Sequence, residues 1–149
     1  MNKPENILAS VQNYVVEKLL SDEILSGETI LAENRRDIES EIKTALGKQG
    51  RVTVVMTPAA TYQGSFEDKS LTWQIDELEV DVIENVPISR GKGNEGKPTG
   101  QDVAMRVFDV LCPLSGDNEG QFSPVSYAQG EDASLLVNKC VLRCLVHKT

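Results

Sequence analysis

The chain has 149 residues, of which 40% are apolar, and its formal net charge is −8. This length suits a single domain with a substantial core. The excess of negative charge argues against a general binder of nucleic acid or anionic membranes, because phosphate groups would be repelled. No apolar run approaches the ~18 residues of a membrane span, so no membrane partner is expected.

The first fifty residues predict two helices around a short strand. In "NILASVQNYVVEKLL", apolar residues recur at steps of three and four, which is typical of an amphipathic helix with Pro4 near its first turn. "ETILAE" (28–33) is a candidate short strand. In "RRDIESEIKTALGKQG", a narrower apolar stripe predicts a second helix, with Gly47 as the residue that follows its end.

From Arg51 the apolar period changes to two, which predicts strands. "RVTVVMT" is a strand, and Pro58 after it either ends the regular pairing or places it at a sheet edge. "TYQGSFEDKS" is expected to be a loop. A long strand follows in "LTWQIDELEVDVIENVP". Its apolar phase slips by one residue between Ile75 and Leu78, and a β-bulge there would return both residues to one face. Trp73 on that face is expected to be buried against the helices.

The opposite face of the long strand carries an acidic row, Glu77, Glu79 and Asp81, which is expected to face water or a partner. Further on, Thr99 and Asp102 have capping-box spacing and start a helix with a wide apolar face. Residues 115–121 form a turn-rich connection, and residues 122–129 and 133–148 are two final strands. The predicted fold is a single α+β domain over residues 1–149. Its sheet is mostly antiparallel, with about four strands and two or three helices packed on one face.

The stretch "GKGNEGKPTG" (91–100) matches two phosphate-binding patterns. Gly91, Gly93 and Gly96 fit G-x-G-x-x-G, and Gly96 with Lys97 fits the end of a P-loop. The context argues against both. Pro98 replaces the hydroxyl residue that would bind Mg²⁺, and the cap at Thr99 places the helix start after the last glycine. The interpretation preferred here is a flexible loop at about 87–100, with Arg90, Lys92 and Lys97 exposed to solvent.

Other residues that could carry chemistry have simpler explanations. Cys112, Cys140 and Cys144 lack chelating spacing and are expected to be buried as small hydrophobic residues. His147 is the only histidine and lies near the C-terminus. No catalytic residue, cofactor or metal site is therefore predicted, and the protein is not expected to be an enzyme.

The order of elements resembles a known family. "TWQIDELEVDVIENVPISRG", then a glycine-rich loop, "TGQDVAMRVFDVLCPL" and a pair of strands, is similar to the small tail-terminator, neck and minor tail proteins of long-tailed bacteriophages. The most specific part is the pattern W-Q-x-x-x-L-x-V-x-V over residues 73–82. The stretch from Glu28 to Gly50 is longer than in tail terminators, which leaves a different neck or minor tail protein open.

The resemblance implies a non-enzymatic assembly protein of a phage or prophage. Such a protein forms a ring, a hexamer in the tail-terminator case, caps the tail tube and joins it to the head. Its partners would be copies of itself, tail-tube proteins and head-completion proteins, with DNA at most passing through a lumen. It would be located in the bacterial cytoplasm during assembly and then in the virion tail.

The candidate subunit interface pairs the acidic row with the basic loop, and it comprises Glu77, Glu79, Asp81, Arg90, Lys92 and Lys97. Two other functions remain open: a bacterial binding or regulatory module that uses the acidic face, and nucleotide binding through the loop at 91–98.

Overall fold

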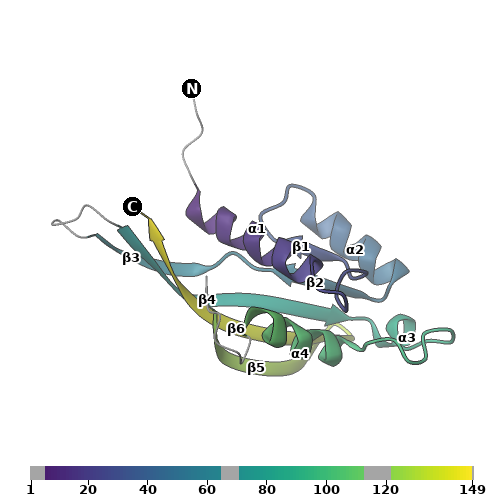
Figure 1. Cartoon of the computed structure of the whole chain (residues 1–149). Coiled ribbons are helices and arrows are strands. Elements are labelled where there is room, and N and C mark those ends of the chain that lie inside the picture. The colour runs from purple at the N-terminus through teal and green to yellow at the C-terminus, as the bar shows by residue number, and fades with distance from the viewer. Residues whose placement is uncertain (1–5, 65–70, 113–121, 149) are drawn as a thin grey trace.

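The long strand β4 (Leu71–Glu84) is the centre of the fold, which a computed structural model describes for residues 6–64, 71–112 and 122–148. Within these residues the sheet has six strands in the order β1-β2-β4-β6-β5, and β3 also pairs with β4 (Figure 1). The other strands are β1 (Ile30–Ala32), β2 (Arg51–Val55), β3 (Ala59–Gly64), β5 (Ser123–Asp132) and β6 (Leu135–Lys148). The helices are α1 (Ile7–Leu20), α2 (Ile38–Lys48), α3 (Val86–Ser89) and α4 (Gly100–Leu111).

The β-bulge predicted in β4 is present. The pairing of β4 with β6 shifts register between Ile75 and Leu78, and both side chains are fully buried. The extra residue returns the two halves of the strand to one face, as the phase slip requires. β4 pairs with β6 along its whole length, with β2 along its C-terminal part and with β3 along its N-terminal part. In Figure 1, β3, the start of β4 and the end of β6 extend beyond the helices as an arm.

The sheet differs from the prediction in strand number and in direction at one edge. β1 and β2 pair in parallel, so the sheet is mixed, although its centre is antiparallel. β3 lies partly in the segment expected to be a loop. Its sequence, "AATYQG", has no large aliphatic residue and ends in glycine, so it has no alternating apolar pattern to reveal a strand. Its strand conformation comes from backbone pairing with β4.

The helices cover both faces of the sheet, which corrects the expectation of a single covered face. α1 and α4 pack on the face of β4 that carries Ile75, Leu78, Val80 and Val82. α2 packs on the opposite face, where a second cluster contains Leu31, Ala45, Val52 and Val54. All five residues of β2 are buried, because that strand has a helix layer on each side.

The helix ends follow the capping chemistry of the sequence, with one correction. Thr99 and Asp102 form the predicted capping box of α4. α2 continues through Gly47 to Lys48, and the glycine in the left-handed region is Gly50, with φ +78°. The prediction that Gly47 follows the helix is therefore wrong by three residues. In the described part of the chain, no helix combines the length and apolarity needed to cross a membrane.

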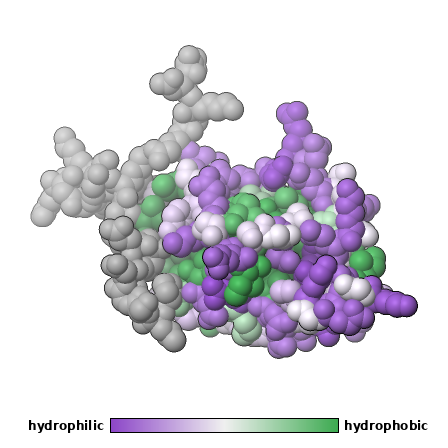
Figure 2. Space-filling view, turned by 45° about the vertical axis from the view of Figure 1, so that its right-hand side comes forward, coloured by the Kyte–Doolittle hydropathy of each residue, from purple (hydrophilic) through white to green (hydrophobic). Residues whose placement is uncertain are grey.

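Two further expectations concern side chains and connections. Trp73 is only partly buried and lies outside the buried core cluster, because it belongs to the arm rather than to the part of β4 beneath the helices. The connection predicted at 115–121 lies outside the described residues. Figure 2 shows apolar surface in the middle of one face, framed by polar side chains. The large apolar residues that remain most exposed are Tyr14, Leu20, Ile24, Met105, Val125 and Leu145.

Candidate subunit interface

The acidic row on β4 passes from solvent into the protein. Glu77 is exposed, Glu79 is half-buried and Asp81 is only 8% exposed. All three lie on the sheet face opposite the main core, which α2 covers only at the β1–β2 edge. Asp81 is buried because it lies between Val54 of β2 and Lys139 of β6, whereas Glu77 lies at the bulge. The row therefore leaves Glu77 exposed and Glu79 partly exposed, and it keeps Asp81 inside the sheet.

Asp81 and Glu79 form a carboxyl pair. Burial raises the pKa of Asp81 to about 7, a hydrogen bond to the Glu79 carboxyl and its negative charge add to the rise, and Lys139 opposes it. Glu33 contributes a further negative charge nearby. Oδ1 of Asp81 has no hydrogen-bond partner among the described residues. Two carboxyl groups that share a hydrogen bond need one proton between them, so this pair holds a proton into the neutral pH range.

Arg90 does not extend freely into solvent as the sequence suggested. Its guanidinium donates to both carboxylate oxygens of Glu84, with Nη2–Oε1 at 2.8 Å and Nε–Oε2 at 3.2 Å. Glu84 is fully buried, and Ser89 Oγ donates to its Oε2 at 2.7 Å. Burial alone would raise the pKa of Glu84, but hydrogen bonds from Arg90, Ser89 and the Gly100 N–H outweigh it and hold the pKa below its ordinary value.

A second ion pair continues this buried network. Arg51 donates from Nε and Nη2 to the two carboxylate oxygens of Glu28, at 2.9 and 2.8 Å. Its remaining nitrogen, Nη1, donates to Ser89 Oγ at 2.8 Å. Ser89 thereby links the Arg51–Glu28 pair to Glu84. The network joins the start of β2, the end of β4 and the short helix α3, so it fixes where the loop after α3 begins.

Three glycines allow close packing around α3 and Glu84. A Cβ atom on Gly50 would lie 2.4 Å from the Ser89 nitrogen, and one on Gly91 would lie 2.7 Å from the Pro87 carbonyl oxygen. A Cβ on Gly100 would lie 3.0 Å from both Asn138 Nδ2 and Glu84 Cβ. The first glycine of "GKGNEGKPTG" is thus explained by close packing against α3, and the last by close packing against Glu84 and Asn138. Phosphate binding is not needed to account for them.

The helix that follows the loop is a poor phosphate site. The first N–H of α4, that of Gly100, bonds to the Glu84 carboxylate, and the Asp102 N–H bonds to Thr99 Oγ1 at 3.3 Å. Asp102 also accepts from the Thr99 N–H at 2.9 Å. A phosphate at this helix N-terminus would have to displace these bonds and would meet two carboxylates. The geometry therefore disfavours the nucleotide alternative.

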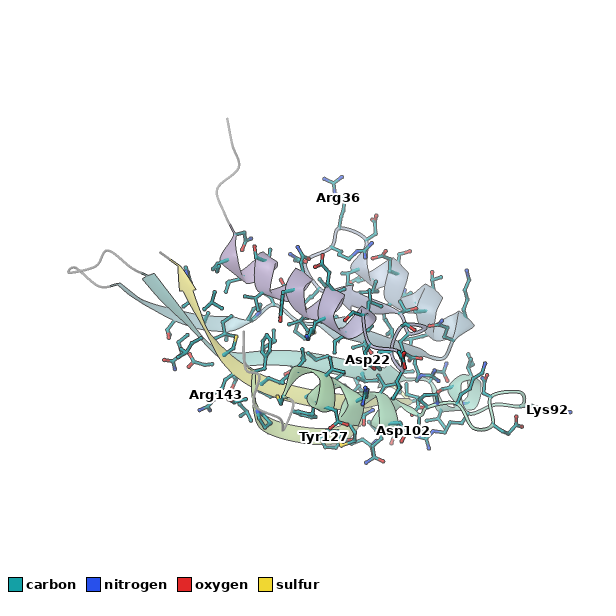
Figure 3. The ribbon with its side chains drawn as sticks, viewed as in Figure 1. Asp22, Arg36, Lys92, Asp102, Tyr127 and Arg143 are labelled. Atoms are coloured by element: carbon teal, nitrogen blue, oxygen red, sulfur yellow. The ribbon has the colours of Figure 1, made fainter. Side chains whose placement is uncertain are left out.

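Lys92 and Lys97 are the loop cations that remain available. Both side chains are exposed, and neither has an ion-pair partner among the described residues. Figure 3 shows Lys92 at the outer end of the loop, pointing away from the body of the protein. Of the ion pairs in the described chain, none joins these lysines to Glu77, Glu79 or Asp81. The acidic and basic halves of the candidate interface are separate surfaces of one subunit.

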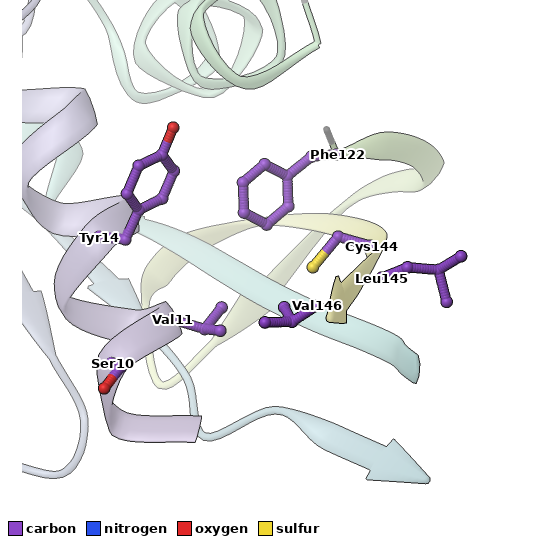
Figure 4. Close-up of a pocket in the computed structure, with 7 residues that line it drawn as sticks. All are labelled: Ser10, Val11, Tyr14, Phe122, Cys144, Leu145 and Val146. Carbon is purple, nitrogen blue, oxygen red and sulfur yellow. The ribbon is translucent and has the colours of Figure 1, made fainter. Parts of the chain in front are cut away.

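The remaining chemical candidates behave as structural residues. Cys140 and Cys144 are buried, and burial raises the pKa of their thiols to about 12 and about 11. Cys144 also borders an apolar hollow of about 440 Å³ between α1 and the end of β6 (Figure 4). Tyr14 and Phe122 stack at its edge, with ring centroids 6.3 Å apart. The hollow has few polar groups to orient a small ligand. The side chain of His147 lies outside the described residues.

The sequence interpretation missed Glu84 and Asn138, although a signal was present. Glu84 continues the alternation of Leu78, Val80 and Val82, and Asn138 occupies the buried face of β6 two residues before Cys140. Asn138 donates to the Val82 carbonyl at 3.2 Å and accepts from Tyr127 at 2.7 Å. A polar residue in phase with a buried apolar stripe indicates a buried hydrogen-bond network.

Comparisons with known proteins give a likeness of fold. No protein-family model matches the chain, and no curated protein matches it. Among solved structures, it resembles a chain from the "Virion of native gene transfer agent (GTA) particle". The TM-score is 0.61 and the sequence identity is 14%, over 97% of this chain and 100% of that chain. The two chains therefore share the same overall fold along essentially their whole lengths.

Proposed function

We propose that this chain is a non-enzymatic structural subunit of a virus-like particle, and that it forms a ring in the manner of a tail terminator. The observation that carries the proposal is the fold shared, end to end, with a chain of a gene transfer agent virion. The resemblance of the segment around Trp73–Val82 to phage tail-terminator and neck proteins supports the same class. In this role the ring caps the tail tube and joins it to the head.

The surface charges suit such a ring. A closed ring needs a heterologous contact, in which one patch of a subunit meets a different patch on the next. The exposed Glu77 with the half-buried Glu79 forms one patch, and the loop lysines Lys92 and Lys97 form a separate patch of opposite charge. Within the six-residue candidate interface, we assign direct contact to these four. Asp81 and Arg90 act from inside their own subunit, because Asp81 is buried and Arg90 is bonded to Glu84.

Ion pairs between exposed side chains of neighbouring subunits would set the orientation of the contact more than its affinity. An exposed ion pair contributes only about 0.2–1 kcal/mol, so apolar contacts must supply most of the binding free energy. We therefore expect a monomer at low concentration and a ring, with six subunits as in a tail terminator, at high concentration or on a tail end.

Sedimentation velocity across a concentration series, followed by electron microscopy, tests the proposal. The second arm adds tail tubes assembled from the tube protein of the same particle. We expect a discrete ring species, and rings located at one end of the tubes. A protein that stays monomeric at all concentrations and does not bind tube ends would refute the terminator role.

A further inference from the structure

Both ends of the loop 91–99 are attached to one buried carboxylate. Arg90, the residue just before the loop, donates two hydrogen bonds to Glu84, and Gly100, just after it, donates its backbone N–H to the same group. The carboxylate is fully buried, and its network reaches β2 through Ser89 and Arg51. Because both ends of the loop bond to the same buried group, their positions are fixed relative to the sheet.

The interior of the loop is hydrogen-bonded as well. Asn94 donates from Nδ2 to the Ile88 carbonyl at 2.9 Å, and its backbone N–H donates to the Gly91 carbonyl at 3.0 Å. The Lys97 N–H then donates to the Asn94 carbonyl at 3.1 Å, and Glu95 accepts from the Gly93 N–H at 2.9 Å. Asn94 therefore ties the middle of the loop back to α3. These bonds form a series of turns and oppose the flexible loop expected from the glycines.

The bonds from Arg90 and Gly100 to Glu84 form a clamp at the base of the loop. Holding a buried carboxylate in this way costs free energy that an ordinary surface loop does not require. Burying the Glu84 carboxylate is unfavourable unless its hydrogen-bond partners are held in place. The main partner, the Arg90 side chain, is 42% exposed, so it is not held there by burial. What the clamp achieves is a fixed position for the loop tip, where Lys92 points outward (Figure 3). A preordered loop loses less conformational entropy when it binds.

We propose that Glu84 and Arg90 are positioning residues for subunit assembly: together they hold the loop 91–99 preformed in the free monomer, so that Lys92 meets the next subunit at a fixed place. This inference rests on the proposed ring. It assigns Lys92 to the contact, and it assigns Glu84 and Arg90 to the placement of Lys92.

The first measurement is hydrogen exchange on the monomer. Arg90→Gln removes the charge that compensates Glu84, and we expect the amides of 91–99 to exchange at least about tenfold faster than in the wild type. The double variant Glu84→Gln/Arg90→Gln removes both charges, so it avoids an unpaired buried ion and keeps the test usable if Arg90→Gln fails to fold. Arg35→Gln is the control, because it breaks an ion pair of equal length, 2.8 Å, on the α2 side.

The second measurement is assembly, by sedimentation velocity. We expect Arg90→Gln and Lys92→Gln each to weaken assembly about threefold to tenfold, and Arg90→Gln/Lys92→Gln to be hardly weaker than Lys92→Gln alone. A purely structural role for Arg90 would instead give additive losses. Arg35→Gln should assemble like the wild type.

Four outcomes overturn the inference. Amides of 91–99 that exchange equally fast in wild type and Arg90→Gln would mean that the clamp does not order the loop. Faster exchange with unchanged assembly, or additive losses, would mean that the ordered loop does not position Lys92, while the proposed ring would still stand. A wild type that never assembles overturns the ring and this inference together.

Discussion

The carboxyl group of Asp81 binds its proton more tightly in the folded protein than in the unfolded chain. Its pKa rises from 3.8 to about 7 because it is buried, hydrogen-bonded to the Glu79 carboxyl and close to that group's charge. The stability from this raised pKa is complete below 3.8 and is lost as the pH rises through about 7. Stability should therefore fall between about pH 4 and pH 7 through this group.

Asp81→Asn should remove this dependence. The amide cannot ionise, so we expect the variant to gain stability relative to the wild type at pH 8, on the order of 1–3 kcal/mol, and little at pH 4. Urea unfolding at several pH values gives the free energy of unfolding. Glu77→Gln, which neutralises an exposed carboxylate on the same strand, should keep the slope of the wild type. Equal slopes in the wild type and Asp81→Asn would contradict the buried acid pair.

Single residues also show what the sequence could and could not predict. Alternation in β4 placed Glu77, Glu79 and Asp81 on one face, and the structure agrees. It could not show that Asp81 is buried, because that burial comes from β2 and β6 on either side, and strand order is a long-range property. The pairing of Arg90 with Glu84 was missed because charged residues near glycines usually indicate a solvated loop.

Near the end of α2, Gly47 and Gly50 lie three residues apart but differ in backbone conformation and in the space around them. Gly50 has φ +78°, and a Cβ there would lie 2.4 Å from the Ser89 nitrogen. Gly47 lies on the exposed side of the helix with nothing within 4 Å of a Cβ. Gly50→Ala should destabilise the protein by about 2 kcal/mol or more, because both the dihedral angle and the space oppose it.

Gly47→Ala should instead stabilise the protein by roughly 0.5–1 kcal/mol through helix propensity. Thermal and urea unfolding of the two variants measure the contrast. If both substitutions had the same sign, α2 would not end where the structure places it, and Gly50 would not pack against α3.

Elements with strong local signals were predicted, and those that depend on distant pairing were not. α1, α4 with its capping box, the bulged strand β4 and the strands β5 and β6 all follow from apolar period and cap spacing. β3 has no such period, and the parallel direction of β1 and β2 is set by the path of the chain through α2. The position of α2 on the second face was missed because β2 is only five residues long and has valines on both faces, so its sequence does not indicate which face a helix covers.

At the scale of the whole molecule, the separation of the two charged patches determines how subunits can meet. Glu77 lies on the central sheet, and Lys92 and Lys97 lie on the loop beyond α3. In the proposed ring, contacts between them join unlike surfaces, so each subunit would use one patch toward each neighbour. In a ring built this way all subunits have the same orientation, so the two faces of the ring differ. That suits a particle component with different partners above and below it.

Two charge-reversed chains test this polarity. Lys92→Glu/Lys97→Glu reverses the loop. Glu77→Lys reverses the exposed carboxylate of the sheet side and leaves the half-buried Glu79 in its pair with Asp81. Each chain alone then brings like charges together between position 77 and the loop at every junction, so it should assemble poorly. In a mixture, the acidic loop of the first chain faces the lysine of the second, and the native loop of the second faces the native sheet of the first. Both junctions are then attractive, and assembly should return as rings in which the two chains alternate.

Native mass spectrometry of the mixture measures ring size and composition. We expect equal numbers of the two chains and an even-numbered ring, which a hexamer permits. Lys43→Glu/Lys48→Glu is the control for net charge, because it changes the same number of exposed lysines on α2 and should leave the wild-type ring unchanged. Rings formed by either reversed chain alone would show that the assigned patches do not meet. Failure of the mixture, with intact rings in the wild type and the control, would show that the two patches do not face each other across the junction.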